Sequence, residues 1–224
     1  MWMTAQNMGI PAFIYDELRV ELKNRLVKII RKLKRSNFRS EDSYFIALFS
    51  ALQTDEVKFG GYYLDFHTAK MADRGPNSAE SKYGCDFSFL VNWKNGDEVI
   101  LRKIIIGQAK NEPYSHLSKT EQRRLFEQCN DMAEITDHYI VTFRNDDDVI
   151  PTVNLGTVGY GGFTNAKIPL DEYIIDKLLS CLHGETNPND IGKMLNSKMS
   201  EQGGYYLYLE TNLPVPVSRS INRD

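Results

Sequence analysis

Apolar residues recur at helical spacing in the first part of the chain. Between residues 13 and 35 a leucine or isoleucine returns every three or four positions, and this period predicts an amphipathic helix. A second helix is expected from Ser40, which can cap its N-terminus and is followed by two acidic residues. The apolar face of this second helix would consist of Tyr44, Phe45, Leu48, Phe49 and Leu52.

The middle of the chain changes to strand-like patterns. A first strand is expected at residues 62–66, where two glycines have ended the helical pattern. Residues 85–93 and 98–109 are two apolar runs joined at Asn95-Gly96, the strongest short-range signal for a β-hairpin. The second run holds three consecutive isoleucines, and a continuous apolar stretch is typical of a strand that is buried on both faces.

The rest of the pattern alternates between helix and strand. Ser118-Lys119-Thr120-Glu121 has the form of a capping box, which predicts a helix from there to about residue 135. The further expected elements are a strand at 138–143, a segment compatible with a strand at 149–158, a helix at 170–182, a short helix near 189–199 and a strand at 205–210. This order predicts an α/β fold with a mixed sheet and helices packed on its faces.

Composition narrows the class of protein. The chain has 224 residues, of which 42% are hydrophobic and 25% charged, as is usual for a globular protein. Cys85, Cys129 and Cys181 are odd in number and widely spaced, which argues against a disulfide framework and a structural zinc site. The N-terminus lacks the pattern of a signal peptide, and no apolar run approaches the roughly 18 residues of a membrane span. We therefore expect a cytoplasmic protein.

Charge is distributed unevenly. Between Arg19 and Arg39 there are nine lysines and arginines and one acidic residue, which leaves a charge of +8 in a chain whose net charge is -3. Such a surface can be a solvated helix face, a patch that contacts nucleic-acid phosphates, or a docking site for an acidic partner protein. The candidate nucleic-acid-binding residues are Lys28, Arg31, Lys32 and Arg35.

Candidate chemistry gathers at one end of the predicted hairpin. Asp86 begins its first strand, and Gln108 and Lys110 end its second strand. Side chains two positions apart in a strand share a face, so the amide and the lysine point the same way. A carboxylate, an amide oxygen and a lysine at one place suit metal-assisted attack on a phosphodiester. Asp86 would be the central ligand, Gln108 a further oxygen ligand, and the lysine would counter negative charge in the transition state.

A second acidic ligand is needed beside Asp86. Glu80, six residues earlier at the junction of loop and strand, is the best candidate, and Glu41 is a weaker one. Each residue also has an ordinary structural explanation: Asp86 as a turn residue after a glycine, Lys110 as a polar strand exit, Glu80 as a surface glutamate. The strand phase and the order of elements together favour the functional interpretation.

Asp86 and Gln108-Ala109-Lys110 resemble the motif of the PD-(D/E)xK nuclease superfamily, which has the restriction-endonuclease-like fold. The match is to the variant with glutamine in place of the second acid, and together with Arg74-Gly75-Pro76 and Glu80 it is similar to nuclease subunits of bacterial anti-phage defence systems. The resemblance covers about residues 40–145 and implies an αβββαβ core and cleavage of DNA, with RNA not excluded. It also implies Mg2+ or Mn2+ held by Asp86, Gln108 and Glu80, with Lys110 as catalytic lysine.

This sequence departs from the family pattern in two ways. No proline precedes Asp86, and Gln108 brings no negative charge to the site. The resemblance divides the chain into a basic helical arm at 1–39, a nuclease-like core at 40–184 and an extension at 185–224. A homodimer or a subunit of a larger defence complex is expected. The alternative is a non-catalytic nuclease-like subunit that binds nucleic acid or a partner protein.

Overall fold

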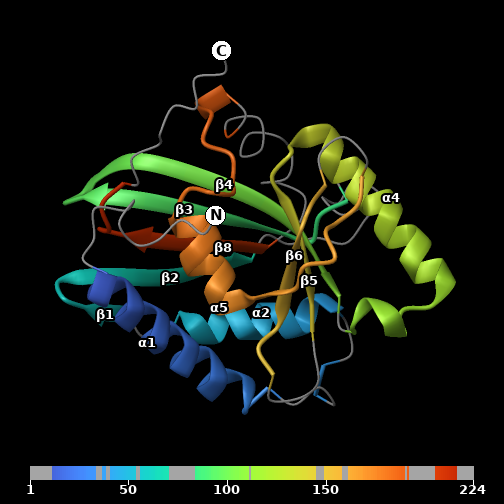
Figure 1. Ribbon diagram of the computed structural model, residues 1–224, viewed down its shortest axis with the longest axis horizontal. Coiled ribbons are helices and arrows are strands. Elements are labelled where there is room, and N and C mark those ends of the chain that lie inside the picture. The colour runs from blue at the N-terminus through green and yellow to red at the C-terminus, as the bar shows by residue number, and fades with distance from the viewer. Residues whose placement is uncertain are drawn as a thin grey trace.

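The computed structural model describes residues 12–33, 37–38, 41–53, 56–70, 84–110, 112–144, 149–157, 161–189, 191 and 205–215. A mixed sheet of eight strands runs through the molecule, with helices on both of its faces (Figure 1). The predicted mixed α/β class is therefore confirmed. No helix among these residues has the length and apolar character needed to cross a membrane.

The sequence expectations account for most of these elements. The helices are α1 (Ala12–Ile30), α2 (Glu41–Leu52), α4 (Lys119–Ile135) and α5 (Leu170–Tyr173), with a 3-10 turn η3 (Tyr114–His116) and a π-helical segment η4 (Ile174–Leu179). The strands are β1 (Val57–Phe59), β2 (Tyr62–Lys70), β3 (Phe87–Asn95), β4 (Glu98–Lys110), β5 (Tyr139–Phe143), β6 (Thr152–Leu155), β7 (Ile168–Pro169) and β8 (Tyr205–Thr211). Within the sheet their order is β1-β2-β8-β3-β4-β5-β6-β7.

The hairpin of β3 and β4 forms as the turn signal predicts. The two strands pair antiparallel from Phe87 opposite Gly107 to Asn95 opposite Glu98. Gly96, in the turn, has a φ of 61°, which a residue without a Cβ adopts at no steric cost. The hairpin therefore brings together the start of β3 and the end of β4, where the candidate site residues lie.

The last strand takes an unexpected place. β8 lies between β2 and β3, antiparallel to the first and parallel to the second. The segment that the sequence places in an extension is thus one of the inner strands of the sheet. The sequence pattern of β8 predicts a strand but not its neighbours, because its partners β2 and β3 lie more than a hundred residues earlier in the chain.

The two faces of the sheet have separate hydrophobic cores. The first core contains residues of α1, α2, α5 and η4 with one face of the sheet, among them Leu18, Leu48, Ile105, Ala109 and Leu178. The second core contains residues of α4 with the other face, among them Leu125, Cys129, Met132, Ile104 and Ile106. Alternation along β4 sends even-numbered residues from Ile104 to Lys110 toward α4 and odd-numbered ones toward α1 and α2.

Two helices differ from expectation, and one predicted helix start is confirmed. The helix predicted to reach residue 35 ends at Ile30, where hydrogen bonds from Lys32 and Leu33 reach back only three residues and tighten the last turn. The helix predicted at 170–182 is α for four residues and then widens to the π-helical η4. The capping box before α4 is confirmed, with Ser118 and Glu121 bonding each other's backbone N–H groups.

Gly84 and Gly96 give a matched test of close packing beside the candidate site. Both have positive φ, but a Cβ on Gly84 would lie 2.3 Å from the carbonyl oxygen of Gln128, whereas one on Gly96 meets nothing within 4 Å. Gly96→Ala should lower the free energy of unfolding by about 1 kcal/mol through backbone strain alone. Gly84→Ala should cost about 1–3 kcal/mol more, because β3 and α4 must move apart. Equal losses in urea unfolding would contradict this packing.

Candidate active site

Asp86 ties the ends of β3 and β4 together. Its backbone N–H donates to the carbonyl oxygen of Gly107 at 2.8 Å. Its carboxylate oxygen Oδ2 accepts from the N–H of Ala109 at 2.8 Å and from Nε2 of Gln108 at 2.5 Å. The predicted meeting of Asp86 and Gln108 is thus present, and the amide nitrogen, rather than the amide oxygen, faces the carboxylate.

The amide oxygen of Gln108 is the exceptional atom of the site. Gln108 is only 1% exposed, and within the described part of the chain its Oε1 is buried with no hydrogen-bond partner. A buried acceptor of this kind ordinarily costs about 1–3 kcal/mol of stability. It therefore marks a place where a donor or a cation would be favourable, a short distance from the Asp86 carboxylate.

Lys110 lies on the same face of β4 as Gln108 and is 5% exposed. The pKa of Glu121, on α4, is lowered mainly by its hydrogen bonds with Ser118. The positive charge of Lys110 lowers it further, so Lys110 lies near the start of α4. It also acts on Cys129, although burial dominates there and raises the pKa of that thiol to about 12. The lysine thus points under α4, between the sheet and the helix.

Sequence reasoning did not single out Arg144, which directly follows β5 and lies beside the backbone of Lys110. Its backbone N–H donates to the carbonyl oxygen of Lys110 at 2.8 Å. Its guanidinium lies 4.2 Å from the ring centre of Tyr44 on α2, and the residue is 2% exposed. A cation stacked on a buried ring binds β5 to α2 at the edge of the site. An arginine directly after an apolar strand was the available signal, and it is a weak one.

Neither candidate acidic partner of Asp86 has a side chain among the described residues. Glu80 and Arg35 lie outside those residues. Glu41 is the first residue of α2, and its side chain is not among those that the structure describes. Across the ranges that the structure describes, no three histidine, cysteine or acidic side chains form a metal-binding group. Asp86 and Gln108 have oxygen atoms of the kind that a hard cation prefers, but two side chains do not complete its shell.

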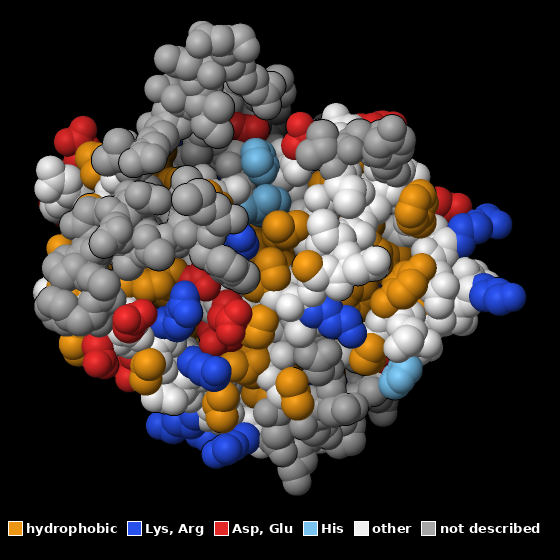
Figure 2. Space-filling view, viewed as in Figure 1, with side chains coloured by type: hydrophobic (Ala, Val, Ile, Leu, Met, Phe, Trp, Pro, Cys, Tyr) orange, Lys and Arg blue, Asp and Glu red, His pale blue; other side chains and the backbone are white. Residues whose placement is uncertain are grey.

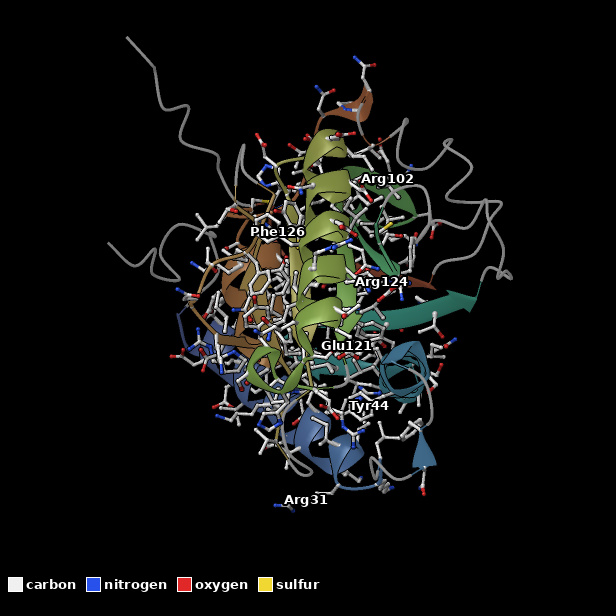
Figure 3. All side chains as sticks on the ribbon, turned by 90° about the vertical axis from the view of Figure 1, so that its right-hand side faces the viewer. Arg31, Tyr44, Arg102, Glu121, Arg124 and Phe126 are labelled. Atoms are coloured by element: carbon white, nitrogen blue, oxygen red, sulfur yellow. The ribbon has the colours of Figure 1, made fainter. Side chains whose placement is uncertain are left out.

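The basic residues of α1 divide into two groups. Arg19 bonds Tyr15 and Asp176, and Nη2 of Arg25 donates to the carbonyl oxygen of Leu52 at 3.0 Å, so both hold α1 in place. The exposed bases at or beyond the middle of the helix are Lys23, Lys28, Arg31 and Lys32. Figure 2 shows lysine and arginine side chains along the lower edge of the molecule, over α1. In Figure 3 Arg31 lies at the bottom of the view, below Tyr44.

Removing the Asp86 carboxylate should test its structural role. Asp86→Ala leaves the Ala109 N–H and the Gln108 amide without their acceptor, and should lower the free energy of unfolding by about 2–4 kcal/mol. Asp86→Asn retains an oxygen that can accept from the Ala109 N–H, so its loss should be nearer 1 kcal/mol. Urea unfolding with a chelator present measures both values. A loss in Asp86→Ala no larger than in Asp86→Asn would show that these hydrogen bonds carry little stability.

Comparison of the chain with protein-family models, with curated proteins and with solved structures gave no match. The interpretation of the site therefore depends on its residues and their geometry.

Proposed function

We propose that the protein is a Mg2+-dependent nuclease that hydrolyses phosphodiester bonds, with β3, β4 and the elements around them as a restriction-endonuclease-like core. The observation that carries the proposal is the contact of Asp86 with Gln108, in which a buried amide oxygen without a partner lies beside a carboxylate. Lys110 follows on the same face of β4. Mn2+ is the natural substitute, because it accepts the same oxygen ligands.

Each residue has a distinct part in this reaction. Asp86 and, after rotation of its amide, Gln108 would hold the cation through oxygen atoms. A cation held there would lower the pKa of a water molecule and polarise a phosphoryl oxygen. The ammonium of Lys110 has no acceptor atom, so it does not bind metal and instead stabilises negative charge that develops on the phosphate. Glu80 is the proposed further ligand, because the site needs a second carboxylate to balance the divalent charge.

The proposed substrate is DNA, and the same chemistry would also act on RNA. The exposed bases Lys28, Arg31 and Lys32 at the end of α1 can neutralise backbone phosphates without reading sequence. Because α1 packs on the face of the sheet opposite to Gln108 and Lys110, these bases would contact a part of the nucleic acid away from the phosphate that is cut. We further propose action in anti-phage defence or restriction, as a homodimer or as a subunit of a larger complex.

The burial of Gln108 and Lys110 favours the alternative function, a nuclease-like subunit that binds but does not cut. Gln108 and Lys110 are almost completely enclosed, whereas a nuclease must bring a phosphate to these groups. A nuclease-like subunit that binds nucleic acid or a partner protein without cutting needs no such access. The two functions differ in whether divalent cations bind at Asp86 and in whether a phosphodiester is broken.

Cleavage by the full chain separates these functions. Wild type should cut plasmid or linear DNA with Mg2+ or Mn2+ and lose activity with a chelator. Lys110→Met keeps the length of the side chain but removes its charge, and should lower the rate on the order of 10²–10³-fold. Asp86→Asn should abolish cleavage. Lys119→Met, which removes an exposed cation at the start of α4, is the matched control and should retain the rate.

Metal binding gives the second measurement. Mg2+ should raise the melting temperature of wild type and of Lys110→Met, but not that of Asp86→Asn, because only the folded site binds the ion. Parallel assays on single- and double-stranded DNA and RNA identify the substrate. If wild type binds nucleic acid but cuts none of these with either metal, the non-catalytic alternative holds.

The basic end of α1 should contribute to nucleic-acid affinity. Replacing Lys28, Arg31 and Lys32 together by glutamine removes three exposed cations and should weaken DNA binding at low salt. The slope of log K against log salt concentration should become shallower by roughly 2–3. The matched control replaces Lys119, Arg123 and Arg124 of α4 by glutamine. An equal effect of both triple variants would show that general charge, rather than this patch, determines binding.

A further inference from the structure

β4 carries a second buried lysine on the face opposite to Lys110. Lys103 is 0% exposed, and its Nζ donates to the carbonyl oxygen of Leu178 at 3.0 Å. The same Nζ lies 5.7 Å from the ring centre of Trp93. Gly184 makes room for the side chain, because a Cβ there would lie 2.5 Å from Cδ of Lys103. The amine is thus held in one place at the C-terminal end of η4.

Cys181 lies beside this amine. Its backbone N–H donates to the same carbonyl oxygen of Leu178, at 3.3 Å, and its side chain is close enough to Lys103 to act on the pKa of that amine. Both residues therefore meet at one oxygen atom, which places the lysine amine next to the backbone of Cys181. Cys181 is half-buried and packs at the margin of the first core, unlike the other two cysteines, which are buried.

The backbone of Cys181 is unusual. With a φ of 58° it is the one non-glycine residue at positive φ among those that the structure describes. It follows the end of η4, where glycine is the favoured residue because a Cβ is strained in this conformation. A cysteine at a strained position is a reason to look for chemistry there.

No other thiol is available to Cys181 within the described fold. Cys85 and Cys129 are buried in the second core, on the far side of the sheet, whereas Cys181 packs against the first core. An internal disulfide would have to cross the sheet. The group that remains within reach of an oxidised Cys181 is the amine of Lys103. Burial lowers the pKa of Lys103, which increases the fraction of neutral, nucleophilic amine.

We propose that Lys103 and Cys181 form a reversible covalent bridge, Nζ–O–Sγ, when the protein meets hydrogen peroxide. One thiol, one amine and two peroxide molecules give the bridge and three water molecules. The S–H bond, one N–H bond and two O–O bonds break, one S–O and one N–O bond form, and four electrons pass from sulfur and nitrogen to peroxide. Two molecules of a dithiol reverse the reaction. Each is oxidised to a disulfide, and the bridge is reduced to the thiol, the amine and one water molecule.

The bridge would fasten β4 to the end of η4. β4 is also the strand that presents Gln108 and Lys110 to α4, so an oxidised chain holds this strand covalently from its other face. The inference does not rest on nuclease activity, because the lysine, the cysteine and their shared carbonyl acceptor lie outside the candidate active site. Its test therefore uses mass and stability instead of cleavage.

The experiment treats the purified full chain with hydrogen peroxide and measures its intact mass. Wild type should gain the mass of one oxygen atom less two hydrogen atoms, lose one titratable thiol and recover both with dithiothreitol. Peptide mapping should find Lys103 and Cys181 in one linked peptide. The melting temperature should be higher in the oxidised form than in the reduced one. Cys129→Ser should behave as wild type, because its thiol is buried in the other core.

Two variants make the inference falsifiable. Cys181→Ser and Lys103→Arg should both lose the linked peptide, and the arginine keeps the positive charge and the means to donate to Leu178. Circular dichroism checks that each variant is folded, and Lys103→Met replaces Lys103→Arg if the larger group disturbs the core. Oxidation of Cys181 only to sulfinic or sulfonic acid in wild type would overturn the proposal, as would an unchanged mass with Cys181 still open to alkylation.

Discussion

In the register of β3 and β4, Phe87 lies opposite Gly107, and that pairing places Asp86 beside Gln108. The glycine is needed, because a Cβ at position 107 would lie 2.4 Å from the Phe87 ring. Because side chains alternate along a strand, a slip of one residue would turn Gln108 and Lys110 toward α1 and α2. The hydrogen bonds of Asp86, the unpartnered amide oxygen and the separation of the two cores all depend on this one register.

Features set by neighbouring residues were predictable, and those set by distant pairing were not. The Asn95-Gly96 turn and the capping box of Ser118 and Glu121 act within a few residues, so their sequence signals are direct. β8 joins β2 and β3 across most of the chain, and its alternating pattern fits several positions in a sheet. The early end of α1 follows from packing, because Leu33 contacts the first core after the helix has stopped.

The same division holds for the candidate site. A period of two puts Gln108 and Lys110 on one face, and the hairpin brings Asp86 to them, so the meeting of these residues follows from local rules. Which end of the Gln108 amide faces Asp86 depends on a side-chain torsion that no sequence pattern encodes. The stacking of Arg144 on Tyr44 joins two elements that only the folded chain brings together.

Lys103 and Lys110 are seven residues apart on β4, so they lie on opposite faces, each in a different core. Burying an ammonium group is costly even where it is hydrogen-bonded, and a strand rich in isoleucine gains little stability from two such groups. Stability alone does not account for both. One lysine follows, on the same face of β4, the amide that bonds the Asp86 carboxylate, and the other lies beside Cys181, whose backbone is strained. The register that gives the two faces separate cores thus gives one strand two separate chemical environments.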